Sequence, residues 1–264
     1  MKKLLSILMQ YIFHKVKSNK LIVMFLFNFN INNKRIDFAE EVNMELTAAI
    51  KGRRSIRKFK PQDVPKNLIT EILETARWSP SWGNTQPWDL YVLTGKVLAK
   101  FKEMNLKQTL AGAEIASDVP MLTKWPDAMK ARYGQLGKIV LSAQGIKRED
   151  KDARDKYYQN MVSMFDAPCL ILACISRDNL VEYQMLDIGI IAQTICLAAH
   201  DKGLGTCLLA AAARYPAEIR KIAAIPDDKK IVVGIAVGYP DLSFPLNNFE
   251  RERAKLDEFV HWME

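Results

Sequence analysis

The stretch from Met185 to Ala199 constrains the fold more than any other part of the sequence. It is apolar nearly all round, so it predicts a helix that is buried on most of its surface. Lys202-Gly203 follows and forms a good stop signal, a basic residue in the last turn and then a glycine. Asp187 and Gln193 interrupt the apolar pattern, and each therefore needs a polar partner.

Strand-like and helical patterns alternate along the rest of the chain. Apolar runs predict strands at 88–93, 168–175 and 231–238, with a further strand after Gly203. Apolar residues at helical spacing predict helices at 66–77, around 98–104 and at 216–223. The segment 105–160 is less regular, and we expect helical excursions there that form a lid or an oligomer contact. With no internal repeat between 44 and 264, the alternation indicates one α/β or α+β domain.

Residues 1–43 differ from the remainder in composition. They hold seven of the 38 basic and three of the 30 acidic residues, so the net charge of 44–264 is +4 rather than +8. Their second apolar run, 21–29, is shorter than the roughly 20 residues that span a bilayer. No small-residue cleavage site follows the first apolar run. We expect translation to begin at Met44, so that 1–43 is untranslated or a disordered extension, with a peripheral membrane anchor as the alternative.

Several function classes are disfavoured by composition. A sequence that is 49% hydrophobic and 26% charged is typical of a globular protein. It shows no basic stripe interleaved with aromatic residues and no zinc-finger spacing, which disfavours nucleic-acid binding. The three histidines lie too far apart to predict a metal site. The four cysteines form no CxxC pair, which favours reduced core thiols in a cytoplasmic protein: Cys169, Cys174, Cys196 and Cys207.

Two motifs carry candidate binding chemistry. The run Arg53-Arg54-Ser55-Ile56-Arg57-Lys58-Phe59 is either a solvated charged face or an anion site, because arginine forks match phosphate oxygens. The stretch Trp78-Ser79-Pro80-Ser81-Trp82-Gly83-Asn84-Thr85-Gln86-Pro87-Trp88 combines rigid aromatics with amides and hydroxyls. It fits a packed aromatic turn as well as a loop that grips a flat, polar-edged ligand. We expect Trp78 and Trp88, at the ends of a helix and a strand, to be core residues.

A third motif, Gly203-Leu204-Gly205-Thr206-Cys207, looks like part of a dinucleotide fingerprint but lacks the third glycine. It also runs from helix to strand, the wrong order for a Rossmann motif. A second arginine cluster, Arg251-Glu252-Arg253, lies near the C-terminus. In this order, the two arginine clusters, the tryptophan stretch and the glycine motif make the chain resemble the FMN-dependent nitroreductase family. The resemblance covers about Met44 to His261.

This resemblance implies an α+β fold, a three-layer α/β/α sandwich with a mixed, mainly antiparallel sheet, in an intertwined homodimer. Residues 44–264 would form the FMN-binding domain, with two FMN sites at the dimer interface. The helix at 185–199 would be a core element of the dimer. NAD(P)H would pass hydride to flavin N5, and a nitroaromatic or quinone would then take two electrons in a ping-pong cycle. The flavin supplies the chemistry, so no catalytic base is expected from the protein.

The resemblance also assigns the site residues. Arg53, Arg54 and Ser55 would hold the phosphate and ribityl side, and Arg57 would stabilise negative charge on the reduced flavin. The other expected cofactor contacts are two arginines of the tail, four residues of the tryptophan stretch from the other subunit, and two alanines after the glycine motif: Arg251, Arg253, Pro80, Ser81, Trp82, Asn84, Ala210 and Ala211.

Some features depart from the family pattern or leave the reaction open. Leu208 to Ala212 replaces an aromatic or acidic residue and a glycine that family members often carry near the flavin. Lys255 stands where proline is common. Reductive dehalogenation, enone reduction, and flavin storage or sensing without fast turnover are the alternatives. The segment 105–160 contains four basic residues that would suit an anionic substrate: Lys124, Arg132, Lys138 and Arg148.

Overall fold

Strand β2 (Cys169–Ser176) is a central strand of a four-stranded antiparallel sheet in the computed structural model, which describes residues 44–178 and 181–264. The strand order is β1-β2-β4-β3, with β1 at Asp89–Thr94, β3 at Gly205–Leu209 and β4 at Lys229–Gly238. In the register, Leu172 lies opposite Tyr91 on one side and Gly234 on the other. We expected a mixed, mainly antiparallel sheet. All four strands pair antiparallel, and the one parallel contact in the described residues is an isolated bridge between Ser55 and Thr206.

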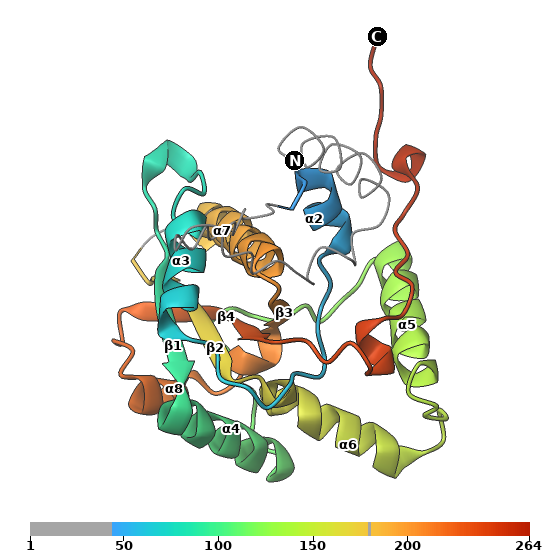
Figure 1. Ribbon diagram of the computed structural model, residues 1–264, viewed down its shortest axis with the longest axis horizontal. Coiled ribbons are helices and arrows are strands. Elements are labelled where there is room, and N and C mark those ends of the chain that lie inside the picture. The colour runs from blue at the N-terminus through green and yellow to red at the C-terminus, as the bar shows by residue number, and fades with distance from the viewer. Residues whose placement is uncertain (1–43, 179–180) are drawn as a thin grey trace, which may run out of the picture. The chain divides into compact units, whose positions relative to one another are not determined.

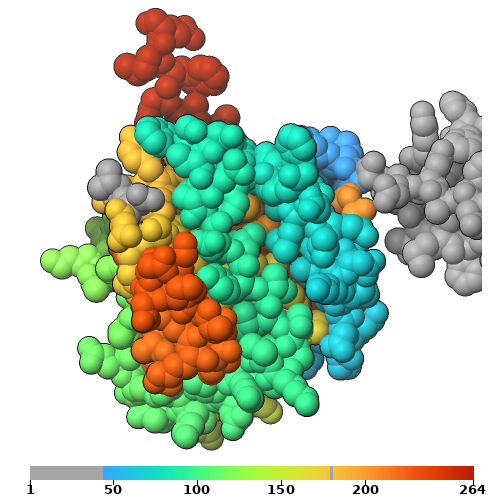
Figure 2. Space-filling model, turned by 90° about the vertical axis from the view of Figure 1, so that its left-hand side faces the viewer, coloured from blue at the N-terminus to red at the C-terminus, as the bar shows by residue number. Residues whose placement is uncertain are grey.

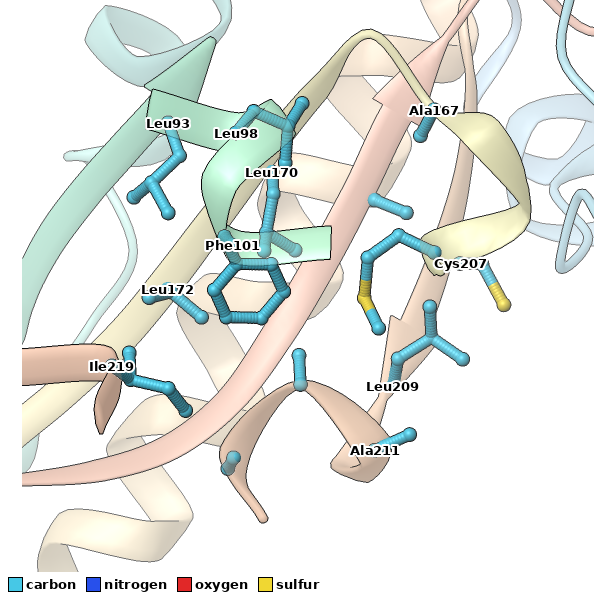
Figure 3. Close-up of a cluster of buried hydrophobic side chains, with 14 of the residues drawn as sticks. Leu93, Leu98, Phe101, Ala167, Leu170, Leu172, Cys207, Leu209, Ala211 and Ile219 are labelled. Carbon is cyan, nitrogen blue, oxygen red and sulfur yellow. The ribbon is translucent and has the colours of Figure 1, made fainter. Parts of the chain in front are cut away.

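The continuous apolar sequence of β2 follows from burial on both faces of the sheet. Alternate side chains point to opposite faces of a strand. Leu170 and Leu172 therefore enter one hydrophobic cluster, together with Phe101 and Ile219 (Figure 3). Cys169 and Ile171 enter a second cluster on the other face. Two separate cores, one on each side of a single sheet, make the expected three-layer α/β/α arrangement.

The helices cover the two faces unequally (Figure 1). On one face lie α3 (Lys66–Ala76) and α7 (Val181–Asp201), whose apolar residues complete the second cluster. On the other lie α4 (Gly95–Leu110), α6 (Lys151–Val162) and α8 (Pro216–Ala223), which contribute to the first. Two further helices, α2 (Leu46–Gly52) and α5 (Asp127–Ser142), complete the described helical segments.

Short 3-10 turns connect these elements. They are η1 (Trp82–Asn84), η2 (Met164–Asp166), η3 (Ala210–Ala213), η4 (Pro245–Asn247) and η5 (Leu256–Glu258). The expected helices and strands are present with small shifts at their ends, and α8 matches its predicted bounds of 216–223. The expected helical excursions in 105–160 are α5 and most of α6. The predictions for 1–43 lie outside the described residues.

Over 185–199, helix α7 is buried or half-buried at most positions, which confirms the expectation, and an exposed stripe runs through Leu186 and Gln193. Ile191 and Ile195 are buried against the sheet, while Tyr183 and Leu186 are 56% and 60% exposed. Asp187 is buried and accepts a hydrogen bond from the Trp82 amide, so its expected partner is present. Gln193 is exposed and can be solvated by water. Among the described residues, nothing covers the apolar part of this stripe at Tyr183 and Leu186.

Three further features of the described residues concern membrane-spanning helices, metal ligands and cysteines. None of the helices in the described segments is long and apolar enough to cross a membrane. No group of three or more potential metal ligands was found in these segments either. All four cysteines are free and buried, and burial raises the pKa of the Cys169 and Cys174 thiols to about 12. These thiols therefore stay protonated and are poor nucleophiles at neutral pH.

Candidate functional site

The first arginine cluster lies on an extended segment that joins the edge of the sheet. Ser55 bridges to Thr206 of β3, and the Ile56 amide donates to the Thr206 carbonyl at 2.8 Å. A Cβ added to Gly205 would overlap Ile56. The second glycine of the motif at 203–207 therefore permits the close approach of the arginine segment to the sheet.

The extended backbone sends successive side chains in different directions. Arg54 Nη1 donates to the carbonyl oxygens of Asn247 and Phe249 at 2.9 and 3.4 Å. Arg251 of the tail makes the reverse connection, with its guanidinium donating to the carbonyls of Lys51 and Arg53. The two arginines thus tie together segments that are almost 200 residues apart in sequence. Part of their donor capacity serves this connection.

Arg57 is held in place by several neighbours. Its amide donates to Asn247 Oδ1 at 2.7 Å, and its Nη1 donates to the Ser55 carbonyl at 3.2 Å. Its guanidinium lies 5.7 Å from the centre of the Phe249 ring, a cation–π distance. It also lies close to Tyr157 of α6, whose pKa is raised chiefly by burial while the Arg57 charge acts to lower it. These contacts restrict the orientation of the Arg57 cation.

Asn247 is a positioning residue that the sequence analysis missed. It is fully buried, and its Nδ2 donates to the carbonyls of Lys58 and Asp241, both at 2.8 Å. Its Oδ1 accepts from the Arg57 amide. All its hydrogen-bonding groups are therefore satisfied, as a buried amide requires. Nothing in its local sequence signals this role, because its partners come from a distant segment.

These segments enclose a cavity of about 540 Å³, within the range of pockets that bind small molecules and cofactors. Six of the twelve predicted cofactor contacts line it: Arg53, Arg54, Ser55, Arg57, Arg251 and Arg253. Four residues of α5 also line it: Arg132, Gln135, Leu136 and Ile139. Of these, only Arg132 was expected from the sequence, as a basic residue that would suit an anionic substrate. Three glutamates of the tail are part of the same wall: Glu250, Glu252 and Glu258.

Positive charge is concentrated in this cavity. Burial, followed by the neighbouring cations Arg54, Arg253 and Arg53, lowers the pKa of Arg251. Burial, followed by the cations Arg53, Arg251 and Arg54, also lowers the pKa of His200 on α7. In addition, Arg53 Nε is buried and has no hydrogen-bond partner in the described part of the chain. A bound anion would relieve the repulsion and could supply an acceptor.

The tryptophan stretch lies elsewhere and does not line this cavity. In Figure 1 the η1 loop is on the side of the molecule opposite α5. Figure 2 shows the molecular surface on that side. The Trp82 amide donates to Asp187 Oδ1 at 3.0 Å, and the Trp82 ring lies 5.7 Å from that of Tyr183. The Trp82 side chain is nonetheless 64% exposed.

The remaining residues of the stretch divide between the surface and the interior. Asn84 and Pro80 are exposed, whereas Ser81 is half-buried and its Oγ accepts from the Gln86 amide at 2.9 Å. Trp88 packs partly buried against the sheet, which confirms it as a core residue. The same expectation was wrong for Trp78, which follows the end of α3 and is 81% exposed, with the Arg77 guanidinium 5.5 Å from its ring centre.

The two alanines after β3 do not line the cavity either. Ala211 is buried in the first cluster, and its carbonyl accepts a hydrogen bond from Asn105 of α4. Ala210 is exposed at the start of η3. A contact of these residues with a flavin stays a prediction.

In comparisons with known proteins, residues 50–239 match the nitroreductase family. The chain is 30% identical over 223 residues to a 4-nitrobenzoate reductase of Pseudomonas putida, covering 83% of this chain and 96% of that protein. It is 32% identical over 224 residues to a chloronitrobenzene nitroreductase of Comamonas testosteroni, covering 80% and 93%.

Solved structures agree with these sequence matches. The FMN- and NADPH-dependent nitroreductase NfnB of a Sphigopyxis strain superposes with a TM-score of 0.81 at 28% identity, covering 84% of this chain and all of that one. The FMN-dependent NfnB of Mycobacterium smegmatis, solved with NADPH, gives a TM-score of 0.78 at 26% identity, covering 83% and 97%. The high TM-scores support the α+β three-layer fold described above.

Proposed function

The chain belongs to the nitroreductase family, and from that premise we propose that it is an FMN-dependent oxidoreductase that uses NAD(P)H to reduce nitroaromatic compounds or quinones. The observation that carries the proposal is the convergence of two distant arginine clusters on one cavity. Each cluster alone fits a solvated surface. Their meeting, with the resulting like-charge repulsion, fits an anion site.

The residues of the cavity fit FMN. Arg53, Arg253 and the Ser55 hydroxyl would bind the phosphate, and Arg53 Nε offers a buried donor that has no partner within the described chain. Arg251 would contribute charge while it holds the backbone of Lys51 and Arg53. Arg54 would act more through the backbone of the tail, since its Nη1 is already occupied by two carbonyls.

Arg57 would have an electrostatic role. The cavity residues would hold FMN, which would supply the redox chemistry for two-electron transfer from NAD(P)H to the acceptor in a ping-pong cycle. The cation of Arg57, fixed by Asn247, Tyr157 and Phe249, would stabilise the negative charge of the reduced cofactor. The described lining of the cavity includes neither a histidine nor a cysteine, which is compatible with a reaction that needs no protein nucleophile.

The tryptophan stretch is proposed to serve a second copy of the chain. In a homodimer, Pro80, Ser81, Trp82 and Asn84 would complete the partner's flavin site. Two observations support this proposal: these residues lie away from the cavity of their own chain, and α7 has an uncovered apolar face beside them. The exposed Leu46 and Ile50 of α2 add to the apolar surface that a partner could cover.

The proposal is tested by anaerobic reduction of the purified protein. NADPH or NADH should bleach the visible absorbance of bound flavin, and a nitroaromatic compound should restore it. Flavin that stays oxidised under NADPH and NADH would contradict the reductase proposal and favour flavin storage. A protein that binds no flavin would contradict both.

A further inference from the structure

Helix α5 presents one continuous face to the arginine-lined cavity. The four lining residues of this helix are spaced i, i+3, i+4 and i+7: Arg132, Gln135, Leu136 and Ile139. This spacing places them along one side of a helix. The face is polar at Arg132 and Gln135 and apolar at Leu136 and Ile139. It therefore matches a ligand with an apolar ring at one end and a charged group at the other.

Arg132 differs from the other arginines of the cavity because its partner is a carboxylate. Its Nη2 lies 2.8 Å from Glu258 Oε2, whereas Arg54, Arg57 and Arg251 donate to backbone carbonyls. The other oxygen of Glu258 accepts from the Lys255 amide at 3.0 Å. The geometry thus shows directly that a carboxylate can bind Arg132 at the edge of this cavity.

The pair between Arg132 and Glu258 is held weakly. Both side chains are about half exposed, at 54% and 47%, and an exposed ion pair contributes little to stability. An incoming carboxylate could replace Glu258 with no net loss of charge pairing. A second contact, from Gln135 Nε2 to Glu252 at 2.6 Å, holds the same helix face to the tail.

Resting on the proposed function, we propose that Arg132 is a specificity-determining residue that selects acceptors carrying a carboxylate, with Glu258 as an internal competitor for the same cation. The relatives are named for both charged and neutral nitroaromatic acceptors, so the comparisons do not decide this question. The aromatic ring of such an acceptor would pack on Leu136 and Ile139, one and two turns after Arg132.

The test compares two acceptors that differ by one carboxylate, 4-nitrobenzoate and nitrobenzene, in the flavin-loaded full chain. The readout is the ratio of their kcat/KM values. Arg132→Gln should lower this ratio about tenfold, since a charge-assisted hydrogen bond to the carboxylate is lost. Glu258→Gln should raise it about threefold, since the competitor for Arg132 is neutralised. Arg132→Lys should restore part of the preference because it keeps the charge.

Arg154→Gln is the matched control, because it removes an exposed arginine of α6 that does not line the cavity. It should leave the ratio unchanged. Raised salt should lower the ratio in the unmodified protein and have little effect in Arg132→Gln. An equal ratio in Arg132→Gln and Arg154→Gln would overturn the proposal. So would a higher KM for NADPH in Arg132→Gln with an unchanged acceptor ratio, which would place Arg132 at the phosphate of the donor.

Binding of benzoate, measured by calorimetry, tests Arg132 without turnover. The flavin-loaded protein should bind benzoate about tenfold more weakly after Arg132→Gln. Its affinity for benzamide, which lacks the carboxylate, should stay unchanged. This result would uphold the role of Arg132 even if the protein reduced neither nitro compound, in which case the proposed function alone would fail. Equal benzoate affinity in both proteins would refute the role of Arg132.

Discussion

The side chains of the arginine-lined cavity contact their own chain, whereas the tryptophan rings of the loop face outward. In the cavity, Arg54, Arg57 and Arg251 contact backbone and side chains of the same chain, which fixes their positions. In the loop, the backbone is anchored through Asp187, but the rings of Trp78 and Trp82 are 81% and 64% exposed. One region is a site assembled within the chain. The other presents binding chemistry outward, where only another molecule can use it.

This difference separates two levels of the proposed function. Cofactor phosphate binding should depend on residues within one chain, whereas the completed flavin site should depend on association of two chains. Substitutions in the two regions are therefore expected to have different dependence on protein concentration.

The largest effect is expected from Arg57→Ala. Removing the cation should weaken FMN binding and slow flavin reduction, by about 100-fold in the rate, because negative charge on the reduced flavin loses its partner. Stopped-flow reduction by NADPH measures the rate. Arg77→Ala is the control: it removes an exposed arginine beside the tryptophan loop and should have little effect. Unchanged reduction kinetics in Arg57→Ala would remove Arg57 from the site.

A smaller effect, about tenfold weaker FMN retention, is expected from Asn84→Ala, because one hydrogen-bonding side chain is lost from the partner's site. Mixing Asn84→Ala chains with Arg53→Gln chains distinguishes the two arrangements. A mixed dimer would combine an intact arginine cluster from one chain with an intact loop from the other, so flavin binding should recover. No recovery on mixing, or a monomer that retains flavin, would show that both regions act within one chain.

The smallest effect concerns pH and His200. Burial and the arginine cluster lower the pKa of His200 in the folded chain. Just below the ordinary histidine pKa of about 6.5, His200 is therefore protonated more readily in the unfolded chain than in the folded one. The contribution of His200 to stability is therefore complete above that pH and is lost as the pH falls through it. Urea unfolding of flavin-free protein at pH 7 and at about pH 5 measures this.

His200→Gln should flatten the pH dependence, and bound FMN should reduce it, since the phosphate would offset the positive charge around His200. A control at the other region is Gln86→Ala in the tryptophan loop, which should leave the pH dependence as it is. The same acid sensitivity in His200→Gln and the unmodified protein would assign it to other groups.

The sequence predicted the elements of the fold well because their patterns are local. The run at 168–175 is apolar on both faces of a strand, and the 216–223 segment has helical periodicity between clear boundaries. Helix α7 was predicted near its position and with burial on most of its surface, which the structure confirms for 185–199. Its apolar composition reports every surface it could cover, including one that this chain leaves exposed.

The site was only half predictable from the sequence. Arginine clusters are visible as motifs, but their positioning by Asn247 depends on hydrogen bonds across about 190 residues. Apart from Arg132, the α5 face was missed because its apolar residues are few and its polar ones resemble an ordinary solvated helix. Its i, i+3, i+4, i+7 spacing could have indicated a single face, though not what that face contacts.

The most direct test of the account is a comparison of FMN with riboflavin, which lacks the phosphate, on flavin-free protein. Fluorescence titration should show FMN binding at least about 100-fold more tightly than riboflavin, because several charge-assisted hydrogen bonds reach the phosphate. Arg53→Gln should remove most of that preference. Equal affinity for FMN and riboflavin in the unmodified protein would contradict the claim that the two arginine clusters form a phosphate site.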